Sequence, residues 1–173
     1  VKRIMVACKK TKALLGDRPE DVLKEIHQVV IRQQNKFDDI YKKIVKELER
    51  NRIFIINEKQ LSDEQKKFVK TYFLQEVRPR LFPVMIDKLP QFPMLKDHSI
   101  YLAVRLRKNP DSRPKHAQIE IPTDVISRFL VLPKKNKNTY IIFLDDVIRA
   151  GLEDIFSMFG FTSFEAYTIK LTR

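Results

Sequence analysis

Apolar residues return every three or four positions over one long stretch near the start of the chain. They are Val22, Ile26, Val29, Val30, Phe37, Ile40, Ile44 and Leu48. This spacing is typical of an amphipathic α-helix, which we expect to begin at Pro19, after a cap at Asp17 or Arg18, and to end near Arg50. Residues 1–13 are apolar and basic, as at the end of a preceding helix.

The length of this predicted helix indicates the kind of protein it belongs to. At about 1.5 Å per residue it reaches about 48 Å, whereas a compact domain of this chain length has a radius of gyration of about 16 Å. We therefore expect the helix to pack in a hairpin or bundle within a multi-domain protein. A coiled coil is the competing interpretation, but its heptads are not sustained.

After residue 50 the pattern becomes mixed. Residues 53–56 are a short apolar run typical of a buried strand. Ser62 followed by Gln65 predicts a capping box that opens a helix, which Pro79 interrupts. Further along, an alternating or β-rich pattern predicts strands over 100–106, 117–121, 129–132, 139–144 and 166–173. Short helices are predicted between them, one capped at 122–124 and ending at Phe129, and one beginning at Asp145.

Together these elements predict an α+β fold: an N-terminal long-helix hairpin or bundle portion, then a mixed domain with a mainly antiparallel sheet and flanking helices. We place the boundary between the two parts after residue 58, which gives 1–58 and 59–173. The chain begins in mid-element without an initiator Met, and its last strand would be an uncovered edge. We therefore expect a piece of a longer protein.

Charge and composition narrow the partner and the compartment. The chain has 34 Lys and Arg against 22 Asp and Glu, a net charge of +12. That balance favours a polyanionic partner, namely nucleic acid, a phosphate polymer, a nucleotide or an anionic membrane, although an ordinary basic surface gives the same charge. With the single Cys8, no signal peptide and no apolar run of about 18 residues, we expect a cytoplasmic protein without a transmembrane segment. Peripheral membrane association stays open.

Two loops concentrate basic residues with few acids beside them. Around the strands at 100–106 and 117–121 they are Arg105, Arg107, Lys108, Arg113 and Lys115, and between the next two strands they are Lys134, Lys135 and Lys137. Arg and Lys are the side chains that bind phosphate oxygens. These residues are therefore candidate polyanion contacts, and the open alternative is that they keep the loops soluble.

Common catalytic patterns are missing from the sequence. The three glycines form no phosphate-binding loop, and one Cys with three His offers no zinc set. We expect His27 to lie at the boundary of a helix face, and His98 and His116 to be solvated.

Two acidic pairs, Asp145-Asp146 and Glu153-Asp154, could bind Mg²⁺, but capping and a solvated helix face explain them with fewer assumptions. We therefore assign no catalytic, metal-binding or cofactor-binding residue to this chain.

Five segments, in order along the chain, resemble bacterial polyphosphate kinases, the ATP:polyphosphate phosphotransferases. They are residues 1–10 (VKRIMVACKK), 51–62 (NRIFIINEKQLS) with 77–79 (VRP), 125–133 (VISRFLVLP), 140–149 (YIIFLDDVIR) and 166–173 (AYTIKLTR). The resemblance implies that 1–58 is the end of the family's N-terminal helical domain and that 59–173 is its head domain.

The resemblance also implies an activity: reversible transfer of the ATP γ-phosphate to inorganic polyphosphate through a phosphohistidine, with Mg²⁺. In the family the phosphohistidine, the metal-binding arginines and most ATP contacts belong to two C-terminal phospholipase-D-like domains. Those parts are not in this chain, so none of its histidines takes the phosphohistidine role. For this chain the family implies homodimer or higher assembly and a position beside the substrate tunnel.

Two other functions stay open on sequence alone. A stand-alone basic module could bind nucleic acid, with Tyr101 and Tyr140 as base-stacking residues on strands. Most phenylalanines fall at core positions, so we expect no nucleic-acid partner. A purely structural dimerisation module is the other alternative, and it is compatible with the polyphosphate kinase interpretation.

Overall fold

The computed structural model describes residues 19–171. The apolar, basic stretch at 1–13, the resembling segment at 1–10, the expected cap at Asp17 or Arg18, and the last two residues of the C-terminal strand lie outside the described residues. The chain divides into two units, Val1–Asn51 and Arg52–Arg173.

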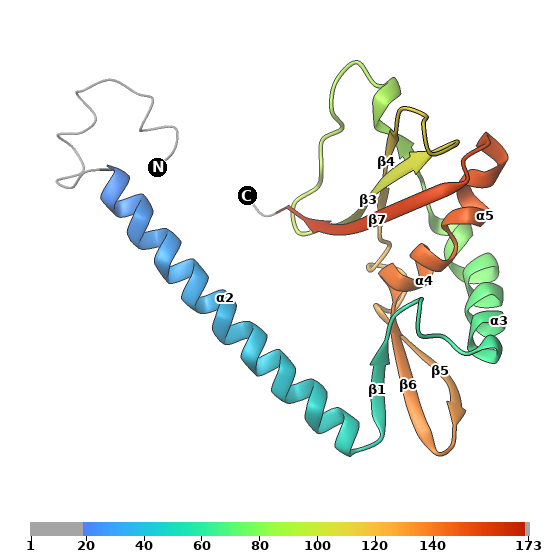
Figure 1. Ribbon diagram of the computed structural model, residues 1–173, viewed down its shortest axis with the longest axis horizontal. Coiled ribbons are helices and arrows are strands. Elements are labelled where there is room, and N and C mark those ends of the chain that lie inside the picture. The colour runs from blue at the N-terminus through green and yellow to red at the C-terminus, as the bar shows by residue number, and fades with distance from the viewer. Residues whose placement is uncertain (1–18, 172–173) are drawn as a thin grey trace. The chain divides into compact units, whose positions relative to one another are not determined.

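In the first unit, α2 (Pro19–Arg50) is one uninterrupted helix, as the apolar spacing predicts (Figure 1). Acidic residues lie in its first turn and Arg50 in its last, which suits the helix dipole. Phe37 and Tyr41, one turn apart, stack with their ring centroids 6.5 Å apart. The hairpin or bundle around α2 stays a prediction.

The second unit contains two sheets (Figure 1). The smaller has the order β1–β6–β5 and consists of β1 (Ile53–Ile56), β5 (Phe129–Lys135) and β6 (Asn138–Phe143). The larger has the order β2–β4–β3–β7 and consists of β2 (Val84–Met85), β3 (Ile100–Arg107), β4 (Lys115–Glu120) and β7 (Ser163–Lys170). Only the β1–β6 pair is parallel, so the predicted α+β fold with a mainly antiparallel sheet is confirmed.

Short helices lie between the strands. They are α3 (Asp63–Tyr72), the π-helix η2 (Phe73–Val77), the 3₁₀ helices η3 (Arg78–Arg80), η4 (Ile86–Lys88) and η5 (Ser157–Phe159), and α4 (Leu144–Ala150) and α5 (Leu152–Phe156). The capping box that opens α3 is confirmed, because Ser62 and Gln65 each bond the other's backbone N–H. No helix among residues 19–171 combines the length and apolar composition that a bilayer span requires.

The core of the second unit follows the alternation of β3. Leu102, Val104 and Leu106 are fully buried, whereas Arg105 between them is exposed. These side chains join buried residues of α3, η2, α4 and α5 in one apolar cluster. Burial of this face sets the position of the helices, and therefore the positions of the loops at the sheet edges.

One predicted element differs from the structure. The helix expected between 122 and Phe129 is wrong: only one turn forms, with the Ile126 N–H donating to the Pro122 carbonyl at 2.9 Å. Phe129 instead begins β5 opposite Phe143. The second compact unit begins at Arg52, and β1 pairs with β6 inside it; the family-domain boundary that we placed after residue 58 stays a prediction.

Candidate functional site

Two of the eight candidate basic residues, Arg105 and Arg107, form hydrogen bonds within the folded chain. Arg105 Nη2 lies 2.6 Å from Glu165 Oε1 across the β3–β7 pair. This hydrogen bond raises the pKa of Arg105 and lowers the pKa of Glu165. Arg107 Nη1 donates to the carbonyl oxygens of Ser112 at 2.7 Å and Pro110 at 3.2 Å, which closes the β3–β4 loop. Their guanidinium groups are therefore already engaged.

Three other candidates are exposed and have no side-chain hydrogen bond or ion pair among the described residues. They are Arg113, Lys134 and Lys137. Lys137 and Asn136 both have positive φ, 63° and 52°, in the tight turn between β5 and β6. That turn lies at one end of the second unit and the β2–β4–β3–β7 sheet at the other, so the two basic loops do not form one surface (Figure 1).

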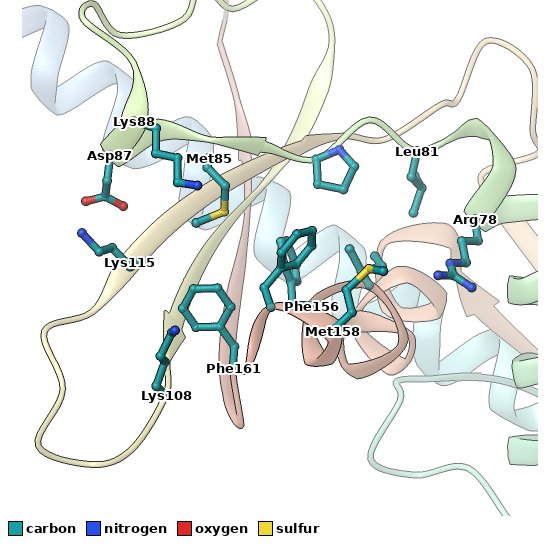
Figure 2. Close-up of a pocket in the computed structure, with 13 residues that line it drawn as sticks. Arg78, Leu81, Met85, Asp87, Lys88, Lys108, Lys115, Phe156, Met158 and Phe161 are labelled. Carbon is teal, nitrogen blue, oxygen red and sulfur yellow. The ribbon is translucent and has the colours of Figure 1, made fainter.

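The side chain of Lys135 lies outside the described part of the structure. The last two candidates, Lys108 and Lys115, line a cavity of about 560 Å³ (Figure 2). Its wall is mostly apolar and consists of Leu81, Pro83, Met85, Ile155, Phe156, Met158, Phe159 and Phe161. Its charged lining residues are Arg78, Asp87, Lys88, Lys108 and Lys115. The structure thus combines an apolar cup with four cationic groups and one carboxylate.

Separate elements place the charged groups around this cavity. Arg78 comes from η3 and Lys88 from η4, whereas Lys108 follows β3 and Lys115 begins β4. Lys108 Nζ lies 5.9 Å from the centroid of the Phe161 ring, a cation–π contact. In Figure 2 the three lysines lie at one side of the cavity and Arg78 at the other.

The one carboxylate of the cavity is held by the neighbouring strand. Asp87 accepts a hydrogen bond from the backbone N–H of His116, whose Nδ1 lies 3.5 Å from the other carboxylate oxygen. The backbone bond is the main cause that lowers the pKa of Asp87, and nearby Lys115 adds to it. Asp87 therefore stays ionised, and the cavity keeps a net positive charge.

Sequence reasoning did not single out Arg78 or Lys88. Arg78 comes just before the Pro79 that interrupts the predicted helix, and Lys88 lies in the stretch after it, for which we predicted no element. The sequence shows their charge. It does not show that they line the same cavity as Lys108 and Lys115, because that depends on long-range contacts such as the pairing of β2 with β4.

A second cluster of charged side chains lies between α4 and β7. Asp145 and Asp146 are buried, 8% and 9% exposed, so the solvated face that we expected for this pair is wrong. Arg149 forms ion pairs with both and donates to the Ala166 carbonyl of β7 at 3.2 Å. Thr168 donates to Asp145 Oδ2 at 2.9 Å. The cluster therefore joins α4 to β7.

Burial raises the pKa of Asp146 to about 6, although Arg149 acts in the opposite direction. Arg128 also approaches this cluster, with Nη2 3.6 Å from Asp145 Oδ1. Among residues 19–171, no group of three or more His, Cys, Asp or Glu side chains is arranged to hold a metal ion.

Residues 64–173 match the family model described as the polyphosphate kinase middle domain. This chain belongs to the polyphosphate kinase family. The match confirms the resemblance to this family, and both the cavity and the α4 cluster lie within the matched range.

Individual polyphosphate kinases show how much of the enzyme this chain represents. The polyphosphate kinase of Vibrio parahaemolyticus is 35% identical over 162 residues, which are 91% of this chain and 23% of that protein. The Escherichia coli polyphosphate kinase is 37% identical over 158 residues, 88% of this chain and 22% of that protein. The chain thus spans about a quarter of the length of these relatives.

The crystal structure of polyphosphate kinase from Porphyromonas gingivalis matches with a TM-score of 0.78 and 28% identity, over 88% of this chain and 26% of that one. The similarity therefore extends from sequence to backbone. The assignment of 1–58 and 59–173 to two named domains of the family stays a prediction.

The three histidines of the chain are all exposed. His27 lies on α2, His98 has its Nε2 3.7 Å from Asp97 Oδ2, and His116 faces Asp87 as described. The two tyrosines considered for base stacking are engaged elsewhere. Tyr101 is 3% exposed, and the Tyr140 ring stacks on Phe54 with centroids 5.5 Å apart.

Proposed function

We propose that this chain is the non-catalytic front portion of a polyphosphate kinase. The enzyme as a whole would transfer the ATP γ-phosphate reversibly to inorganic polyphosphate through a phosphohistidine, with Mg²⁺, as the family resemblance implies. The observation that supports this most directly is coverage: the relatives match about nine tenths of this chain, and the match is about a quarter of their own length.

The role we propose for the chain itself is assembly of the enzyme, as a homodimer or higher homo-oligomer, and flanking of the path of the phosphate polymer. The exposed and unpaired Arg113, Lys134 and Lys137 are the best-placed polymer contacts, because no described carboxylate neutralises them. We propose no ATP-transferring residue within the chain. A cytoplasmic location belongs to the same proposal, with peripheral membrane association left open.

The gene tests this proposal first. We expect the reading frame to continue past Arg173 with several hundred residues that contain the histidine and arginine motifs of the phospholipase-D type. A frame that ends near Arg173 would contradict the proposal and leave a detached polyanion-binding or assembly domain.

Light scattering of the purified product of the whole gene tests the assembly role. The proposal expects a dimer or larger species at micromolar concentration, and a strictly monomeric enzyme would overturn that part.

A further inference from the structure

The cavity between η3, η4, the β3–β4 hairpin and α5 has cationic side chains on two sides of an apolar wall (Figure 2). We infer that this cavity docks an acidic segment of a partner protein, in which large apolar side chains are flanked on both sides by Asp or Glu. The apolar side chains of the partner would fill the cavity, and its carboxylates would lie at the cationic rim. The volume of about 560 Å³ is within the range of binding pockets, roughly 300–1,000 Å³.

The apolar wall of the cavity has a buried floor and an exposed rim. Phe156 and Phe161 are 1% and 8% exposed, whereas Met158 and Phe159 are 74% and 59% exposed. Large apolar side chains that gather in the open at a cavity are typical of an interaction site. Anchor side chains of a partner protein bind in such pockets, and methionine adapts its shape to them.

The exposed rim is held in place by the neighbouring strand. Phe159 ends η5, and Gly160 after it has a φ of 76°, in the left-handed region. The backbone N–H of Thr162 donates to the Arg107 carbonyl at 2.9 Å, and its hydroxyl donates to the Lys108 carbonyl at 2.9 Å. The apolar rim and the backbone of Lys108 are therefore tied together before a partner binds, which lowers the entropic cost of binding.

The cationic rim has little compensating charge. Four exposed cations line the cavity and form no side-chain hydrogen bond or ion pair among residues 19–171, namely Arg78, Lys88, Lys108 and Lys115. The one acidic lining residue, Asp87, is engaged by the backbone N–H of His116. The lining thus has a net charge of +3, which is complementary to a segment with several carboxylates.

The two-sided arrangement of charge favours a protein segment over other anions. A fatty acid or a lipid has one anionic head, so it would leave either Arg78 or the lysines without a counter-charge. An inorganic polyanion would leave the apolar wall uncovered. An acidic protein segment supplies apolar anchors and carboxylates on both sides of them; the anchors contribute most of the affinity, and the charges contribute the selectivity.

Fluorescence anisotropy with the 173-residue chain tests this inference. The probe is the fluorescein-labelled peptide DEFLDE-amide, and its matched controls are NQFLNQ-amide, which lacks the carboxylates, and DEGSDE-amide, which lacks the apolar anchors. We expect each control to bind roughly tenfold more weakly than the probe, since it meets only half of the cavity. Absence of DEFLDE binding, or equal binding of either control, would overturn the inference.

Competition distinguishes the other classes of anion. Unlabelled DEFLDE-amide should displace the probe at a lower concentration than sodium laurate or sodium tripolyphosphate does. Displacement by either of these at the lower concentration would overturn the inference in favour of a lipid or an inorganic polyanion.

Charge variants locate the binding. We expect Lys88→Ala with Lys115→Ala to weaken DEFLDE binding roughly tenfold, and Arg78→Gln, on the other side, to weaken it about threefold. Lys36→Ala with Lys42→Ala removes the same charge as the first pair from the exposed surface of α2 and should change binding by less than about twofold. Equal losses in the two double variants, or an Arg78→Gln variant with the affinity of the parent, would overturn the inference.

Phe159→Ser tests the apolar rim, and the exposure of this side chain makes it a mild change for the fold. It should weaken binding of DEFLDE-amide and leave the weaker binding of DEGSDE-amide unchanged; an unchanged DEFLDE affinity would overturn the inference. Thermal unfolding of each variant checks that it remains folded, and Met158→Ser replaces Phe159→Ser if the latter unfolds. The readout is peptide binding and not kinase activity, so failure here and failure of the proposed enzyme function are distinguishable.

Discussion

The ring of Phe73 lies so close to Gly151 that a Cβ on Gly151 would stand 2.3 Å from the Phe73 Cζ atom. Phe73 is 1% exposed and begins the π-helix η2, while Gly151 separates α4 from α5. The contact lets η2 pack closely against the junction of α4 and α5. It follows that only glycine fits at position 151 without movement of the ring.

Gly151→Ala should therefore destabilise the second unit by about 1–3 kcal/mol, the usual cost of overpacking a core. Urea denaturation measures this as a lower midpoint. In a double-mutant cycle with Phe73→Leu, the smaller side chain should recover part of the loss. A Gly151→Ala variant as stable as the parent would show that the ring moves freely and that the contact does not constrain the packing.

The buried Asp146 should make stability depend on pH in an unusual direction. Its pKa is raised from 3.8 to about 6 by burial, so the folded protein binds this proton more tightly than the unfolded chain. Its stabilising contribution is fully present below about pH 3.8 and is lost as pH rises through about 6. The effect corresponds to at most about 3 kcal/mol.

Asp146→Asn removes this titration. Between pH 4 and pH 7, the free energy of unfolding of the variant should rise relative to that of the parent. Glu165→Gln is a control of opposite sign, because Arg105 lowers the pKa of Glu165 and its contribution is lost as pH falls. Parallel pH profiles for the parent and Asp146→Asn would contradict the raised pKa.

The sequence predicts the elements that depend on contacts within a few residues. It does not predict those that depend on contacts between distant parts of the chain. The α2 helix and the Ser62–Gln65 capping box were predictable because both depend on contacts within a few residues. The turn at 122–129 was not, because the pairing of Phe129 with Phe143 draws the chain into β5 before a second helical turn can form.

The same distinction applies to the candidate sites. Charge in the loops identified Lys108 and Lys115, but nothing local indicated that Arg105 would pair with Glu165, which is sixty residues away. Nor could the sequence show that Asp146 is buried against Arg149, since the spacing suits a solvated helix face equally well. Long-range sheet pairing decides which basic residues are engaged and which line a cavity.

The β5–β6 turn gives a prediction about the polymer. Replacing Lys134, Lys135 and Lys137 by Ala should weaken polyphosphate binding and lower its salt dependence, with stability changed by less than about 0.5 kcal/mol. Binding titrations at several salt concentrations measure this. The matched control replaces Lys36, Lys42 and Lys43 on α2, which removes the same charge from another exposed surface. An unchanged salt slope in the turn variant, or an equal change in the control, would mean that the turn is not a contact.

The central claim, that this chain is the non-catalytic front portion of a polyphosphate kinase, is tested most directly by an activity measurement. The purified 173-residue chain and the product of the whole gene are each incubated with ATP and Mg²⁺, and polyphosphate synthesis is followed. We predict ATP-dependent polymer from the whole product and none from the chain alone. Polymer synthesis by the chain alone would contradict the account.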